Sequence, residues 1–214
     1  MSPLLSLPAL SAPNSAPNSG AAADSRSATA GVFQSDDKSF RLALPSAAWQ
    51  LDETPLPRAE MPTRYFHLRG ARPGGAGGAG GAGGGGVALE VVVEPSTGPK
   101  RLAELGSLDA VAEQLVATWP QPGTLLSAEK IGRPNMFALD SYQVRFKTGT
   151  QQQVVRLALQ QSRRYQLFVS LPMEADEAVA REVDALVASF EAYPLNLGCL
   201  RASNEGVPPV AICY

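Results

Sequence analysis

The chain has 214 residues and a formal net charge of −2 at pH 7. A charge so near neutrality argues against long-range attraction to nucleic acid. The sequence has no run of eighteen or more apolar residues that could cross a membrane as a helix. We therefore expect one domain of ordinary size, at residues 33–193, that binds no nucleic acid and has no transmembrane segment.

Residues 1–32 are rich in Ser, Ala, Pro and Asn and lack the periodicity of a packed element. This composition is typical of a disordered arm. A targeting remnant is the alternative, because the short apolar run 4–10 is followed by the small residues 21–23, which resemble a processing site. Both interpretations stay open.

Two strands are expected before the glycine-rich region. Apolar and other side chains alternate over residues 40–44 and again over residues 65–69, which is the period of a strand with one buried face. In the second strand this pattern buries Phe66 and Leu68. His67 is then expected to point towards solvent.

Residues 70–86 form a run of glycine and alanine. Glycine-rich loops can cradle phosphate because their backbone amides approach an anion closely. Here no Lys-Ser or Lys-Thr follows, and the run leads into the strongly apolar strand 87–94 instead of a helix. We therefore favour a flexible hairpin insertion, which costs little in a surface loop.

A first helix is expected from Leu108 to Trp119. Ser107 is a suitable N-cap, apolar residues three and four apart form one stripe, and Pro120 ends the helix. A second helix follows Pro172 and has its own apolar stripe. The second stripe comprises Val179, Val183, Leu186, Val187 and Phe190.

Between the helices, the patterns over residues 125–130, 138–147, 155–159 and 165–169 predict consecutive hairpin strands. Hairpins bracketed by helices indicate an α+β fold on an antiparallel sheet. The tail, 194–214, shows no period. Its two cysteines, Cys199 and Cys213, either close a disulfide loop worth about 3 kcal/mol or remain free thiols, and their position excludes a cysteine-built metal site in the core.

Little in the sequence suggests catalysis. The chain has one histidine, so neither a His-based triad nor a multi-histidine metal site is expected. A general-base role for His67 is the alternative to a solvent-facing strand residue, and no standard catalytic motif is present. Calcium needs several oxygen ligands at once, and the acidic pairs lack such spacing: Asp36 and Asp37, Asp52 and Glu53, Asp109 and Glu113. We expect no enzyme.

A set of cations on the meander is the candidate binding site. The set comprises Arg145, Lys147, Arg156, Arg163 and Arg164. Such a strip is common on the solvated face of an antiparallel sheet. The functional alternative is a docking surface for an acidic partner.

Three segments, taken in order, resemble the PsbP family. Residues 37–45 followed by Trp49 resemble the opening strand of the PsbP domain, residues 105–112 its Leu-Gly-Ser start of the first long helix, and residues 188–190 the end of its final helix. The resemblance covers about residues 33–193. The glycine insertion and the cysteine-bearing tail are not family features.

The resemblance implies an αβα sandwich around a central six-stranded antiparallel sheet, without catalytic residues. It also implies an extrinsic protein of the chloroplast thylakoid lumen that associates with photosystem II and its oxygen-evolving complex, or assists its assembly or stability. The partner would be a photosystem core or an assembly intermediate. Two alternatives are an accessory factor for photosystem I and a nuclear import module of the same fold that binds a Ran-type GTPase. Calcium is the cofactor that the family suggests, and no metal ligand is carried over, because the family's proposals need histidine and acidic residues that His67 alone does not supply.

Overall fold

The computed structural model describes residues 31–53, 56, 64–73, 86–133, 138–160 and 163–194. Nearly all of the expected N-terminal arm and of the C-terminal tail, with both cysteines, lies outside these residues. Most of the glycine-rich insertion does too. The expectations for those segments therefore stay predictions.

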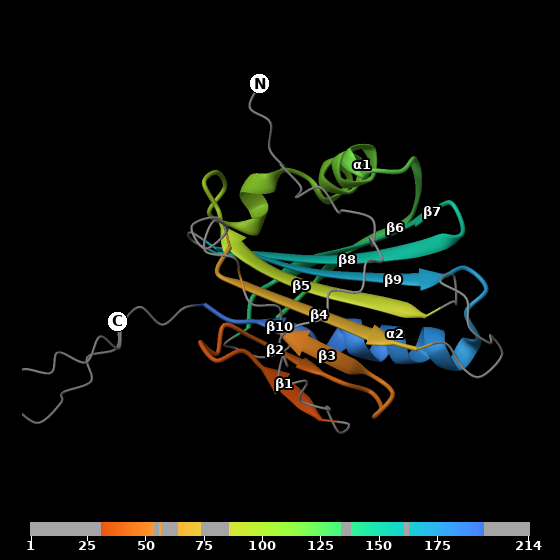
Figure 1. Ribbon diagram of the computed structural model, residues 1–214. Coiled ribbons are helices and arrows are strands. Elements are labelled where there is room, and N and C mark those ends of the chain that lie inside the picture. Colours follow the sequence, from red (N-terminus) through yellow and green to blue (C-terminus); the bar gives the residue numbers. More distant parts are fainter. Residues whose placement is uncertain are drawn as a thin grey trace, which may run out of the picture.

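The described residues form two antiparallel sheets, of seven and three strands (Figure 1). The large sheet has the order β3-β4-β5-β9-β8-β7-β6, and the small sheet has the order β1-β2-β10. The strands of the large sheet are β3 Gln50–Glu53, β4 Phe66–Arg72, β5 Val87–Pro95, β6 Gly123–Ile131, β7 Ser141–Thr148, β8 Gln151–Gln160 and β9 Arg163–Pro172. The strands of the small sheet are β1 Val32–Gln34, β2 Phe40–Ala43 and β10 Glu191–Ala192.

The helices are the 3-10 helix η1 Leu102–Leu105, and the α-helices α1 Leu108–Thr118 and α2 Glu177–Ser189. After β5, the chain passes through η1 and α1 to the far edge of the large sheet. It then returns through β6, β7, β8 and β9, and β9 pairs with β5 in the middle. Figure 1 shows α1 on one side of the large sheet and α2 with the small sheet on the other.

Helix α1 begins as the sequence predicts. The hydroxyl of Ser107 accepts a hydrogen bond from the backbone N–H of Ala110 at 3.2 Å, which pairs one of the otherwise open donors of the first turn. Gly106 precedes this cap with φ of 108°, a conformation that side chains disfavour. The apolar stripe buries Ala112 and Leu115 against one face of the large sheet. The predicted first helix is therefore confirmed.

Helix α2 packs on the opposite face. Asp176 caps it by accepting from the backbone N–H of Val179 at 2.8 Å. All five residues of the predicted stripe are buried in the largest core cluster. This cluster lies between α2, the large sheet and the small sheet, and it includes an aromatic group formed by Phe33, Phe40, Phe66 and Phe190.

The expected fold class is wrong. The chain is mostly β, with sheets of seven and three strands and two α-helices among the described residues, and it is not an αβα sandwich around a six-stranded sheet. The sequence missed β1, β3 and β10, which have three, four and two residues. Strands this short cannot show a clear alternation, and only pairing with distant segments defines them. Gly149 lies in the hairpin turn between β7 and β8, and its φ is 56°.

Candidate functional site

An open groove with a volume of about 660 Å³ lies at one end of the large sheet. It is formed by η1 with the two residues before it, the end of β6 and the residues that follow, the start of β7 and the end of β8. The charged residues that line it are Lys100, Arg101, Lys130, Arg133 and Asp140. Four cations and one carboxylate give the lining a net charge of +3, whereas the whole chain carries −2.

Asp140 does not neutralise the groove. Lys130 Nζ and Arg133 Nε each lie 3.6 Å from one of its carboxylate oxygens. The two cationic side chains are 58% and 61% exposed. Exposed pairs at this distance contribute little, because water screens them and two long side chains must be ordered. Both cations therefore remain available to an anionic ligand.

The opposite wall comes from the segment before η1. Lys100 donates from Nζ to the backbone oxygen of Ser96 at 3.2 Å and is exposed. Arg101 forms an isolated antiparallel bridge with Gln160 at the end of β8, and no described residue forms an ion pair with its guanidinium. The side-chain oxygen of Gln160 is buried in the groove wall and has no hydrogen-bond partner among the described residues. The groove thus offers mainly positive charge to a ligand.

Sequence reasoning missed this groove. Two of the chain's four lysines, Lys100 and Lys130, line it, but they are thirty residues apart. Lys130 ends an expected strand, whereas Lys100 lies between two expected elements. The bridge between Arg101 and β8 and the pairing of β6 with β7 bring them to the same place. The one local signal is the adjacent pair of cations, Lys100 and Arg101, which directly precedes a short helix.

The structure places one of the five predicted docking cations in the interior. Arg156 is 2% exposed. Its Nε donates to the hydroxyl of Ser141 at 2.8 Å, and its Nη1 donates to the backbone oxygens of Val187 and Ala188 at 2.6 and 3.2 Å. Arg156 therefore closes the C-terminal end of α2 and is out of reach of a partner.

Three of the other four cations already hold carboxylates, and the set does not share one face. Arg145 pairs with Asp184 of α2 at 2.7 Å, and Arg163 pairs with Asp37 at 2.7 Å. Arg164 pairs with Glu94, its register partner on β5. Strand residues alternate between faces, so Arg163 and Arg164 lie on opposite faces of the sheet. Of the five cations, only Lys147 is exposed. Docking through this set stays a prediction.

His67 does not face solvent, contrary to expectation. It is 4% exposed, and its Nε2 lies 2.5 Å from Oε1 of Glu90 on the neighbouring strand. Burial raises the pKa of Glu90, but the hydrogen bond from His67 and the positive charges of His67, Arg69 and Arg64 outweigh it, so the pKa lies below its ordinary value. The expectation failed because both faces of the large sheet are covered, so alternation does not distinguish an inner from an outer face.

The described residues offer no fit for calcium. Within them, no group of three or more His, Cys, Asp or Glu side chains is arranged to hold a metal ion. Asp37, one of the acidic residues considered, instead accepts from Ser35, from the backbone of Ser39 and from Arg163. Over the same parts of the chain, no helix has the length and apolar character needed to cross a membrane.

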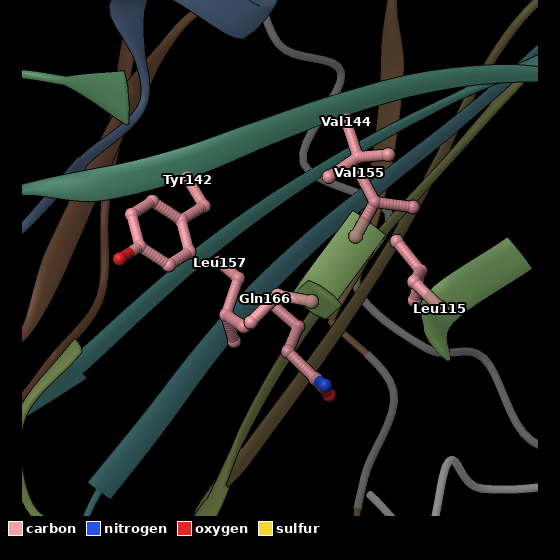
Figure 2. Close-up of a pocket in the computed structure, with 7 residues that line it drawn as sticks. Leu115, Tyr142, Val144, Val155, Leu157 and Gln166 are labelled. Atoms are coloured by element: carbon pink, nitrogen blue, oxygen red, sulfur yellow. The ribbon is translucent and has the colours of Figure 1, made fainter. Parts of the chain in front are cut away.

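A small cavity of about 10 Å³ lies between α1 and the large sheet. Figure 2 shows Gln166 beside Leu157 on the neighbouring strand, with Leu115 on the helix side. Gln166 is 2% exposed, and its side-chain oxygen has no hydrogen-bond partner among the described residues. The cavity has room for about one water molecule and none for an organic ligand, so the groove is the better candidate site.

Comparison with known proteins supports the fold alone. A scan against protein-family models and a search of curated proteins find no match. Among solved structures, the solution structure of cyanobacterial PsbP (CyanoP) from Synechocystis sp. PCC 6803 matches with a TM-score of 0.53 and 12% identity, over 78% of this chain and 95% of that one. A crystal structure from Bacteroides thetaiotaomicron matches with a TM-score of 0.39 and 10% identity, over 78% of this chain and 50% of that one. This match is too weak to support an assignment. The chain therefore has a fold similar to that of cyanobacterial PsbP.

Proposed function

We propose that this chain is a non-catalytic, PsbP-like protein of photosynthesis that acts in the thylakoid lumen and docks on a photosystem core or on one of its assembly intermediates. The observation that carries the proposal is the likeness in fold to cyanobacterial PsbP, which extends over 95% of that protein. The order of the PsbP-like segments at residues 37–45, 105–112 and 188–190 agrees with it. Photosystem II with its oxygen-evolving complex is the first candidate partner.

The basic groove supports docking by charge. Its net charge of +3 is concentrated at one end of the large sheet, in a chain whose overall charge is −2. Such a patch attracts an acidic surface and orients the encounter. Lys147 and the partly exposed Arg145 are secondary candidate contacts on another part of the sheet. Calcium has no part in this proposal, because the described residues do not fit it.

Thylakoid fractionation tests the proposal. We expect the chain, detected by antibody in its native host, to resist protease added to intact thylakoids. It should leave the membrane when opened thylakoids are washed with high salt. After mild solubilisation, it should co-migrate with a photosystem core on a sucrose gradient. Co-migration with photosystem I would reassign the partner, and recovery only in stroma, cytosol or nucleus would contradict the proposal.

A further inference from the structure

Among the residues that the structure describes, strand β6 forms an open edge of the large sheet. It is last in the strand order, and β7 is its one pairing partner in this part of the chain. The residues Thr124 to Ser127, with Glu129 and Lys130, are exposed. An edge strand presents unpaired backbone N–H and C=O groups, which can pair with a strand from another chain.

A bulge divides this edge in two. The register with β7 shifts between Leu125 and Ser127, and the exposed Leu126 lies at the shift. Bulges re-aim a strand and interrupt pairing along an edge. From Ser127 to Ile131, the register is continuous over five residues. This regular half runs directly towards Arg133 and the basic groove.

The two faces of this half differ in charge. Lys130 lies opposite Tyr142 and lines the groove, whereas the preceding residue, Glu129, projects to the other face and accepts from Nε2 of Gln143 at 2.6 Å. In a strand added to this edge, the side chains on the groove face would therefore lie near cations. The side chains on the opposite face would lie near the carboxylate of Glu129. This pattern favours a segment whose acidic residues all lie on the groove side.

We propose that the edge of β6 from Ser127 to Ile131 accepts an extended acidic segment of a partner protein as an added strand. Alternate carboxylates of that segment contact Lys130 and Arg133, and the segment continues into the groove towards Lys100 and Arg101. Main-chain pairing supplies affinity in this binding mode, and the alternate side chains supply specificity.

Lysine at an edge is also a known protection against edge-to-edge aggregation. The two roles agree, because positive charge on the edge repels a second copy of β6 at Lys130 and favours an acidic strand instead. Specificity is a difference between two affinities, here those for an acidic strand and for a second copy of β6. The proposed segment deepens the docking function above, since it identifies the chemistry of the partner's contact.

Fluorescence anisotropy with the purified full chain tests this proposal. The probe is a fluorescein-labelled ten-residue peptide of alternating glutamate and valine, in low salt. We expect saturable binding that weakens as salt rises. The double variant Lys130→Glu, Arg133→Glu should weaken binding about tenfold or more. The milder pair Lys130→Gln, Arg133→Gln should have a smaller effect, and Arg181→Glu on the exposed face of α2 should have none.

A second probe separates strand addition from simple charge attraction. Methylation of alternate backbone nitrogens keeps every charge of the peptide but removes N–H donors on one edge. Methylation of the pairing edge should weaken binding about tenfold, and methylation of the other edge should leave it unchanged. Equal binding of both methylated forms, or unchanged binding to the charge-reversed variant, would overturn the proposal. This assay uses no thylakoids, so its failure is distinct from failure of the proposed localisation.

Discussion

Arg156 Nη1 lies 2.6 Å from the backbone oxygen of Val187, so a strand residue of the large sheet closes the C-terminal end of α2. The last four carbonyl groups of a helix have no partner inside the helix, and a cation there also complements the helix dipole. Burial lowers the pKa of Arg156 to about 10, although the negative charges of Glu191 and Glu129 act in the opposite direction. The interaction fixes α2 on its face of the sheet.

Replacement of this arginine should destabilise the fold. We expect Arg156→Leu to lower the free energy of unfolding by about 3 kcal/mol, because the oxygens of Ser141, Val187 and Ala188 lose a buried donor. Urea unfolding followed by circular dichroism measures this change. Arg181→Leu, at an exposed position of α2, is the control and should change stability by less than about 0.5 kcal/mol. Equal stability of the Arg156 variant and the wild type would contradict a capping role.

Tyr165 should make the fold sensitive to alkali. Its hydroxyl donates to the backbone oxygen of Tyr193 at 3.0 Å, and burial raises its pKa to about 12 from an ordinary value of 10.0. Because the folded pKa lies above the unfolded one, the stabilisation is complete below pH 10 and is lost as pH rises towards 12. Tyr165→Phe should cost about 1 kcal/mol at pH 7.

The difference in stability between wild type and Tyr165→Phe should shrink between pH 10 and 12. Arg156 contributes an opposite slope in this range, since its folded pKa is lowered, but that slope is common to both proteins and cancels in the comparison. Urea titrations at pH 8, 10, 11 and 12 measure the difference. A difference that stays constant over this range would show that Tyr165 has no raised pKa.

The pair of the buried His67 and the partly exposed Glu90 should make stability decrease in acid. The pKa of Glu90 is lowered, so its stabilisation is present above its unfolded value of about 4.5 and is lost as pH falls through the folded value. Glu90→Gln should lower stability by about 1–2 kcal/mol at pH 7 and should flatten the decline below pH 4.5. Thermal unfolding from pH 3 to 7 measures both effects. If both proteins lost stability equally below pH 4.5, the Glu90 carboxylate would be excluded as the source of that loss.

Gln166 should be a position where an apolar substitution stabilises the chain. Its side-chain oxygen lies buried without a hydrogen-bond partner among the described residues, next to apolar groups from α1 and the sheet. Gln166→Met keeps the length of the side chain and removes the cost of a buried unpaired polar atom, so the free energy of unfolding should rise by about 1 kcal/mol. Urea unfolding measures the change. A decrease of similar size would mean that the amide is paired in solution.

The long periodic elements could be predicted from the sequence. The stripe and cap of α1 and the strand β5 follow from local alternation and capping chemistry, and they lie where the sequence predicted them. The face that a strand residue occupies was harder to predict. His67 and Arg156 look like exposed polar residues in an alternating pattern, but both are buried because both faces of the large sheet are covered.

The sequence by itself determined the helices, the hairpin strands and the absence of a recognisable catalytic motif, because periodicity, caps and turn residues act over a few neighbours. Only the tertiary structure decided the number of strands, the second sheet and the basic groove. Strands as short as β10 exist through pairing with distant partners. The groove exists because β8, η1 and the end of β6 meet at one end of the large sheet, and that meeting places Lys100 and Lys130 in the lining of the same groove.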